Sequence, residues 1–121
     1  MSHFSTLRSK LTDAEILKAS LQDLGIEVKT NTGVRGLCNQ TVQADIVAVL
    51  DGDCDLGWLR HSDGSLAIIA DLWGVAKKHD LTKLMDVVNQ KYAINKTLAE
   101  VKRPGLQHAN VKLSLQNHIT A

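Results

Sequence analysis

The feature that most constrains the fold is the stretch ADIVAVLDGDCDLGWLRHSDGSLAIIADL, residues 44–72, in which three short apolar runs are separated by two Asp-Gly pairs. Each run has the length of a strand, and Asp-Gly between two such runs is typical of a tight turn between antiparallel strands. We therefore predict a meander of three antiparallel strands. The strands are expected at residues 45–50, 55–60 and 66–72.

The second turn sets the register of the last two strands. A two-residue loop at Asp63-Gly64 pairs Trp58 with Ile69. Alternate side chains of a strand point to the same side of a sheet. This register therefore predicts that Trp58, Ile69, Asp71 and Trp73 share one face.

A helix is predicted before the meander, at about residues 12–24. Thr12 as N-cap and Glu15 three residues later form a capping box, and apolar residues then recur at helical spacing. Gly25 is well placed to follow the last turn, where a positive φ is needed.

A second helix is predicted after the meander. Asp80 is its N-cap, and an apolar stripe runs through Leu81, Leu84, Met85, Val88 and Tyr92. The stripe drifts beyond Tyr92, so we expect a kink or break near 92–95. Pro104-Gly105 is expected to end this helix.

The rest of the chain predicts shorter elements. Residues 3–10 and 26–28 are expected to form strands, and the polar segment 30–43, with two glycines, a long irregular loop of the kind that often carries function. Residues 111–116 alternate apolar and polar side chains, which predicts an exposed edge strand able to dimerise or accept a partner strand. Residues 117–121 are expected to form a loose tail.

This order of elements predicts the fold class. We expect one α+β domain over residues 1–116, a two-layer sandwich in which two helices pack on one face of a mostly antiparallel sheet of about five to six strands. The pattern is similar to a ferredoxin-like variant.

Composition and charge narrow the function classes. Cys38 and Cys54 are too few and too far apart for a disulfide scaffold or a CxxC metal knuckle, and we expect both to be reduced. We expect no signal peptide and no membrane-spanning segment, because the sequence shows no apolar run of the required length. Residues 1–74 carry a net charge of −4 and residues 75–121 one of +5. This dipolar distribution, with no exposed stacking aromatics on the basic helix, argues against a nucleic-acid binder.

Five side chains are candidates for a partner-binding surface. Asp71 lies inside an apolar run, and it is either a functional or a structural acid. We favour the structural interpretation, in which its carboxylate caps the turn at Gly74 or pairs with Lys77 or Lys78. Trp73, beside a glycine at a corner, is either an interface anchor or part of the core. Lys77 and Lys78 follow the corner, and Arg35 lies in the 30–43 segment.

Metal and catalytic chemistry have weaker support in the sequence. Asp51, Asp53 and Asp55 are the candidate metal ligands, but their spacing departs from a calcium loop, and acids with glycine are also typical of a turn. We therefore expect no metal and no cofactor. If the protein is an enzyme, the candidate catalytic residues are Cys38, which lies near Arg35, and Asp71. No catalytic dyad can be assembled from the sequence.

Long motifs carry a resemblance to a known family. MSHF, ADIVAVLDG, DLGW, IADLWGVAKKH and QKYAINKTLAEVKRPGLQHANVKL resemble the hypothetical chloroplast reading frame thirty-five family over essentially the whole chain. This domain of unknown function occurs in cyanobacteria and in red-algal-type plastids. The resemblance implies a cyanobacterial cytosolic or plastid stromal location, and it supplies no activity and no site residues.

Together these observations favour a non-enzymatic adaptor, assembly factor or regulatory binding module with a protein partner. Two alternatives stay open: a small-molecule or metal-binding regulatory domain, and a small enzyme that uses Cys38 or Asp71.

Overall fold

Five antiparallel strands form one sheet in the order β1-β5-β4-β3-β2 in the computed structural model, which describes residues 3–101. Consecutive strands β2 to β5 are neighbours, so the meander predicted from the Asp-Gly turns is confirmed. The strands are β1 (Phe4–Leu7), β2 (Glu27–Arg35), β3 (Thr41–Val49), β4 (Leu56–Arg60) and β5 (Leu66–Asp71).

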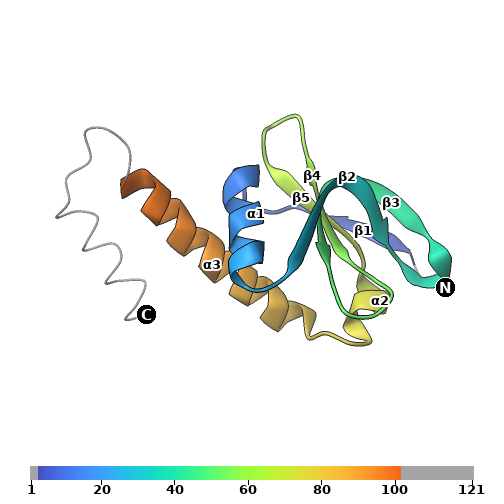
Figure 1. Ribbon diagram of the computed structural model, residues 1–121. Coiled ribbons are helices and arrows are strands. Elements are labelled where there is room, and N and C mark those ends of the chain that lie inside the picture. The colour runs from blue at the N-terminus through green and yellow to red at the C-terminus, as the bar shows by residue number, and fades with distance from the viewer. Residues whose placement is uncertain (1–2, 102–121) are drawn as a thin grey trace.

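Two helices cover one face of this sheet (Figure 1). Helix α1 (Ala14–Asp23) lies over β2 and β3, and helix α3 (Leu81–Val101) packs against α1. A short helix, α2 (Leu72–Ala76), connects β5 to α3, and a 3-10 turn (Leu37–Asn39) connects β2 to β3. The predicted two-layer α+β sandwich is therefore confirmed. The ferredoxin-like comparison stays a prediction, because the last strand of that pattern, 111–116, lies outside the described residues.

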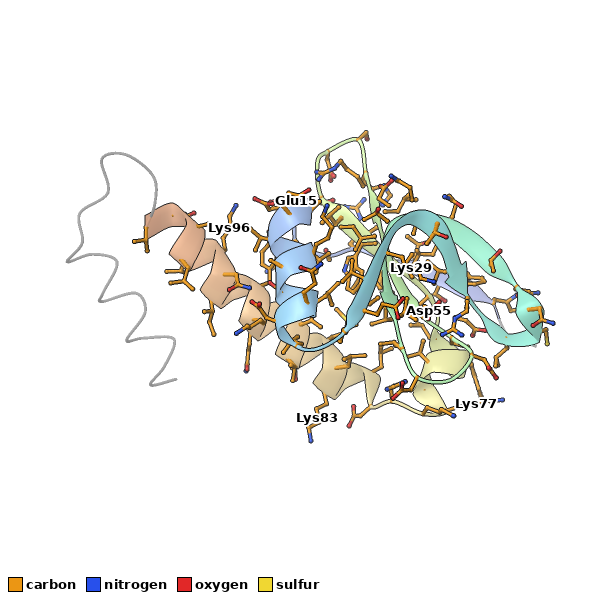
Figure 2. The ribbon with its side chains drawn as sticks, viewed as in Figure 1. Glu15, Lys29, Asp55, Lys77, Lys83 and Lys96 are labelled. Carbon is orange, nitrogen blue, oxygen red and sulfur yellow. The ribbon has the colours of Figure 1, made fainter. Side chains whose placement is uncertain are left out.

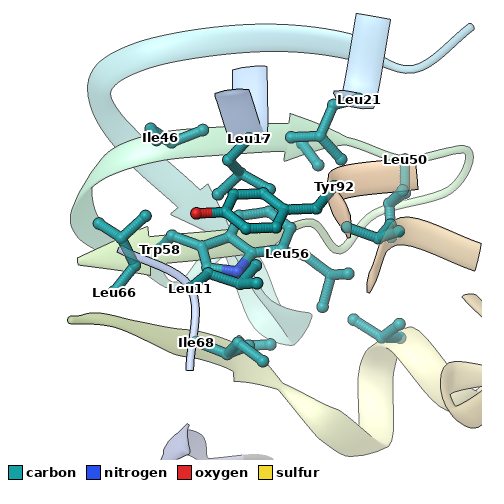
Figure 3. Close-up of a cluster of buried hydrophobic side chains, with 14 of the residues drawn as sticks. Leu11, Leu17, Leu21, Ile46, Leu50, Leu56, Trp58, Leu66, Ile68 and Tyr92 are labelled. Atoms are coloured by element: carbon teal, nitrogen blue, oxygen red, sulfur yellow. The ribbon is translucent and has the colours of Figure 1, made fainter. Parts of the chain in front are cut away.

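The main core lies between the sheet and the helices (Figure 3). Trp58 of β4 is fully buried at its centre, with Leu17 and Leu21 of α1 on one side and Tyr92 of α3 above the indole ring. The Tyr92 hydroxyl accepts hydrogen bonds from the backbone N–H groups of residues 12 and 13 at 3.3 and 3.0 Å, which ties α3 to the start of α1.

The sheet curves, so that β2 contacts β4 and β5 although neither is its neighbour in the strand order. Gly57 of β4 marks the closest approach, because a Cβ there would overlap Val34 and lie 3.0 Å from Ile69 Cγ2. Only glycine leaves room for the Val34 side chain against the β4 backbone. A second, smaller apolar cluster forms at this crossing, around Val34, Ala44, Val47 and Ile69.

The predicted loop at 30–43 was wrong. The segment is a β-hairpin in which Thr32 to Arg35 pair with Thr41 to Ala44, and only the 3-10 turn interrupts it. Cys38 and Asn39 both have φ of 60°, as a type I′ turn requires. The sequence signal was hidden because this turn usually carries Asn-Gly, whereas here a cysteine takes the first left-handed position.

The predicted register between β4 and β5 was also wrong, by one residue. His61 N donates to Ser65 O at 2.8 Å, so three residues form the loop rather than two, with Gly64 at a φ of 90°. Trp58 consequently pairs with Ile68. A shift of one residue moves side chains to the opposite face, so Asp71 does not share a face with Trp58.

Two helix details differ from prediction. Asp13 rather than Thr12 caps α1, its carboxylate accepting from Ile16 N at 3.1 Å. Helix α3 begins after Asp80, as predicted, but continues without a break to Val101. The predicted helix end at Pro104-Gly105, the strand at 111–116 and the tail at 117–121 lie outside the described residues.

Candidate functional site

Asp71 ends β5 and caps α2 at one end of the sheet, which we call the Trp73 corner (residues 71–78). Its side chain is fully buried. One carboxylate oxygen accepts from Gly74 N at 3.1 Å and the other from Leu37 N at 3.0 Å. The carboxylate therefore joins the start of α2 to the β2–β3 turn, and the cap on Gly74 agrees with the structural interpretation of this acid.

Gly74 lets α2 pack directly on the strands. A Cβ at this position would overlap Cys54 Sγ and lie 3.0 Å from Leu37 Cγ. The thiol of Cys54, which is buried, thus fills the space that any larger residue at 74 would take. Sequence reasoning missed Cys54 and Leu37 as parts of this corner; the Asp-x-x-Gly spacing of a helix N-terminus was the available signal.

Arg35 and Asp55 form an ion pair beside the corner. Arg35 Nε and Nη2 donate to the two carboxylate oxygens at 2.9 and 2.8 Å, and the backbone N–H of Arg35 donates to the same group at 3.1 Å. Leu50 N also donates to it, at 3.2 Å. Asp55 is buried, whereas the Arg35 side chain is 42% exposed. The hydrogen bond to Asp55 raises the pKa of the Arg35 guanidinium, against the opposing effect of burial.

Two hollows connect these groups to the surface. One, of about 380 Å³, is lined by Arg35, Cys38 and Asp53 among others. The other, of about 60 Å³, is lined by Cys54, Asp53 and the two lysines 77 and 78. Leu37 lines both hollows. Two segments about 40 residues apart in sequence therefore meet at one end of the sheet, and they carry the predicted binding residues Arg35, Lys77 and Lys78.

Trp73 is on the outside of this corner. Its side chain is 77% exposed, more than any other large apolar side chain within residues 3–101. Lys77 and Lys78 are exposed too, and Figure 2 shows Lys77 pointing away from the body of the molecule. Of the two interpretations of Trp73, packing in the core is therefore excluded.

The candidate metal ligands do not gather around one point. Within residues 3–101, no three His, Cys, Asp or Glu side chains lie close enough together to hold a metal ion. Asp55 is already bound by Arg35, and Asp51 contributes its backbone oxygen to a 3.0 Å contact with His79 Nε2.

The two thiols differ in environment. Burial raises the pKa of Cys54, and the nearby acids Asp71, Asp53 and Asp55 raise it further. A raised pKa lowers the thiolate fraction and with it the reactivity of the thiol. Cys38 is exposed on the hairpin turn. A catalytic role for Cys38 or Asp71 stays a prediction.

Comparison with known proteins places the chain in a family. A family model described as "Protein of unknown function (DUF1257)" matches residues 20–119. The chain belongs to the DUF1257 family. An "Uncharacterized protein ycf35" of Guillardia theta is 31% identical over 96% of this chain and 97% of its own length. A protein of the same description from Pyropia yezoensis is 28% identical over 88% and 84%.

These matches confirm the family resemblance that the sequence motifs carry. No solved structure matches the DUF1257 chain. No helix among its described residues is long and apolar enough to cross a membrane. The function of the family is unknown.

Proposed function

We propose that this protein is a non-enzymatic binding module, an adaptor or assembly factor that docks a protein partner at the Trp73 corner. The observation that carries this proposal is the 77% exposure of Trp73. Tryptophan is enriched among the few residues that dominate binding energy at protein interfaces. Leaving so large an apolar side chain in water is unfavourable for the isolated protein, and a partner pocket would remove that cost.

The way the corner is built supports this role. A helix of five residues is too short to be stable alone. The buried carboxylate of Asp71 and the contact of Gly74 with Cys54 fix α2 on the sheet. A binding residue on a fixed backbone loses less freedom when it binds, which favours affinity. Asp71 therefore acts by positioning Trp73 rather than by touching the partner.

The charges around Trp73 define the partner chemistry. Lys77 and Lys78 follow it on the exposed surface. We expect a partner with an apolar pocket for the indole and acidic side chains at its rim. Arg35 contributes indirectly, because two of its donors are held by Asp55. The algal relatives support a partner in the plastid stroma or the cyanobacterial cytosol.

Affinity capture with matched variants tests the proposal. The tagged protein, Trp73→Ala and Val87→Ala are incubated with lysate of a red alga or cyanobacterium, and each captured protein is then titrated against all three. Val87 is a suitable control because it is also exposed, at 40%, but lies on α3. We expect Trp73→Ala to weaken binding of the captured partner at least tenfold, the size of effect that defines an important interface residue.

The outcome that contradicts the proposal is equally specific. A partner that binds Trp73→Ala as tightly as the native protein uses another surface. A second measurement is acrylamide quenching of tryptophan emission, since Trp73 is exposed and Trp58 is fully buried. Partner binding should protect the accessible component, and an unchanged quenching profile in the complex would exclude contact at Trp73.

A further inference from the structure

A second surface feature, a large groove that shares no lining residue with the Trp73 corner, has no role so far. It has a volume of about 940 Å³ and runs between α3, β5 and the segment that leads from β1 to α1. Apolar side chains line much of it: Leu11, Ile68, Met85, Tyr92 and Ala93. Its volume lies at the upper end of the roughly 300–1,000 Å³ that small-molecule sites enclose.

The groove exists because the helical layer covers the sheet unevenly. Helix α1 lies over β2 and β3, and α3 packs chiefly against α1. The β5 side of the same face is thus left with an opening beside α3. The Tyr92 hydroxyl accepts from two backbone N–H groups, so the tyrosine is fixed in place as part of the wall.

The charges of the groove select the ligand. Arg8, Lys10 and Lys96 are lining residues, and none of the lining residues is acidic. Lys96 Nζ forms an ion pair with the carboxylate of Asp13, which does not line the groove, at 3.7 Å. Arg8 and Lys10 are exposed, on the segment between β1 and α1. A cationic rim around an apolar trough is complementary to a molecule with an apolar body and an anionic head.

The core beneath the groove contains an unpaired donor. Within the described part of the chain, Trp58 Nε1 is the buried side-chain polar atom without a hydrogen-bond partner. Figure 3 shows this nitrogen on the side of the indole that faces Leu11 and Ile68, two residues of the groove. Buried donors are normally satisfied. Trp58 does not line the groove itself, but it belongs to the same core cluster as Leu11 and Ile68, which do.

From these observations we infer that the groove binds an amphiphilic anion, a small molecule with an apolar chain or ring system and a carboxylate or phosphate head. The apolar body lies against Leu11, Ile68 and Met85. The head is held by Arg8 and Lys10 at the rim. This site is independent of the protein partner proposed for the Trp73 corner.

Trp58 provides the readout. The full-length chain carrying Trp73→Phe has Trp58 as its single tryptophan, beneath the groove. Decanoate, below its micelle concentration, is titrated against this protein and its emission recorded. Decyl phosphate, decanol and inorganic phosphate are titrated in parallel. We expect saturable changes with decanoate and decyl phosphate, binding at least tenfold weaker with decanol, and none with inorganic phosphate.

Charge variants complete the test. Arg8→Glu/Lys10→Glu should weaken decanoate binding at least tenfold, whereas Lys83→Glu, a single charge reversal on α3 outside the groove, should not. Far-UV circular dichroism checks that each variant folds. The inference is overturned if decanoate leaves Trp58 emission unchanged, if decanol binds as tightly, or if the two charge variants behave alike.

Other occupants give distinguishable results, each of which also overturns the inference. If decanoate binds only to the full chain that carries Leu113→Ser/Leu115→Ser, the C-terminal segment of the protein itself occupies the groove and competes with decanoate. If Trp58 emission changes with protein concentration in the absence of ligand, a second copy fills it. Failure at the Trp73 corner leaves all these measurements unaffected, because they use no protein partner.

Discussion

The contact between Gly74 and Cys54 yields a quantitative prediction about how the Trp73 corner is held. Gly74→Ala adds a Cβ that overlaps Cys54 Sγ and lies 3.0 Å from Leu37 Cγ and 3.3 Å from Asp71 Cγ. Overpacking of this kind costs about 1–3 kcal/mol. The better helix propensity of alanine offsets this by up to about 1 kcal/mol. We expect a net loss of about 1–2 kcal/mol in the free energy of unfolding.

The second variant removes the obstacle. Cys54→Ala deletes one buried sulfur atom and should cost about 1 kcal/mol in lost burial and residual cavity. In the double variant the Cβ of residue 74 enters the space that sulfur vacated. We therefore expect the free energy of unfolding of the double variant to lie within about 0.5 kcal/mol of that of Cys54→Ala alone, which corresponds to a favourable coupling of at least about 0.5 kcal/mol.

Urea unfolding of the four proteins, followed by far-UV circular dichroism, measures this cycle. Equal m-values across the series would show that the unfolded states are comparable. Additive effects, with the double variant destabilised by the sum of the two single changes, would refute the contact and with it the account of how α2 is fixed.

Three further predictions concern the groups beside the corner. Asp55→Ala should destabilise the fold by about 3–5 kcal/mol, because it leaves the N–H of Leu50 and that of Arg35 without their acceptor, and retention of native stability in chemical denaturation would contradict the structure. For the thiols, Cys38 should react with a disulfide reagent at once and Cys54 only on unfolding. Because burial raises the pKa of Cys54, the unfolded chain ionises first as the pH increases, so native stability should be intact below the ordinary thiol pKa and fall above it. Cys54→Ala should lack this alkaline loss, and identical pH profiles of the two proteins would exclude the assigned environment.

Particular residues show how far the sequence could predict this fold. The Asp-Gly pairs at 51–52 and 63–64, the Asp80 cap and the helical spacing of leucines in α1 are local signals, and the elements they predict are present. Local signals failed to distinguish a two-residue from a three-residue loop between β4 and β5. The loop at Asp63-Gly64 takes three residues, and this reversed the face assigned to Asp71.

The candidate site depended on contacts that no spacing rule contains. That Asp71 was a cap at Gly74 could be anticipated from four consecutive residues. Its second acceptor bond, from Leu37, joins positions 34 residues apart, which no local pattern predicts. The exposure of Trp73 was undecided for the same reason, since the side that α2 presents to water depends on the contact between Gly74 and Cys54.

The sequence by itself therefore determined the class of fold, the order of strands β1 to β5 with a helix on either side of the meander, and the family, because periodicity, turn residues and long motifs are properties of neighbouring positions. The tertiary structure alone decided the curvature at Gly57, the pairing of Arg35 with Asp55, and the opening left beside α3 above Trp58. Each of these results from non-local packing, in which the available volume between distant segments decides which side chains are buried, paired or left exposed.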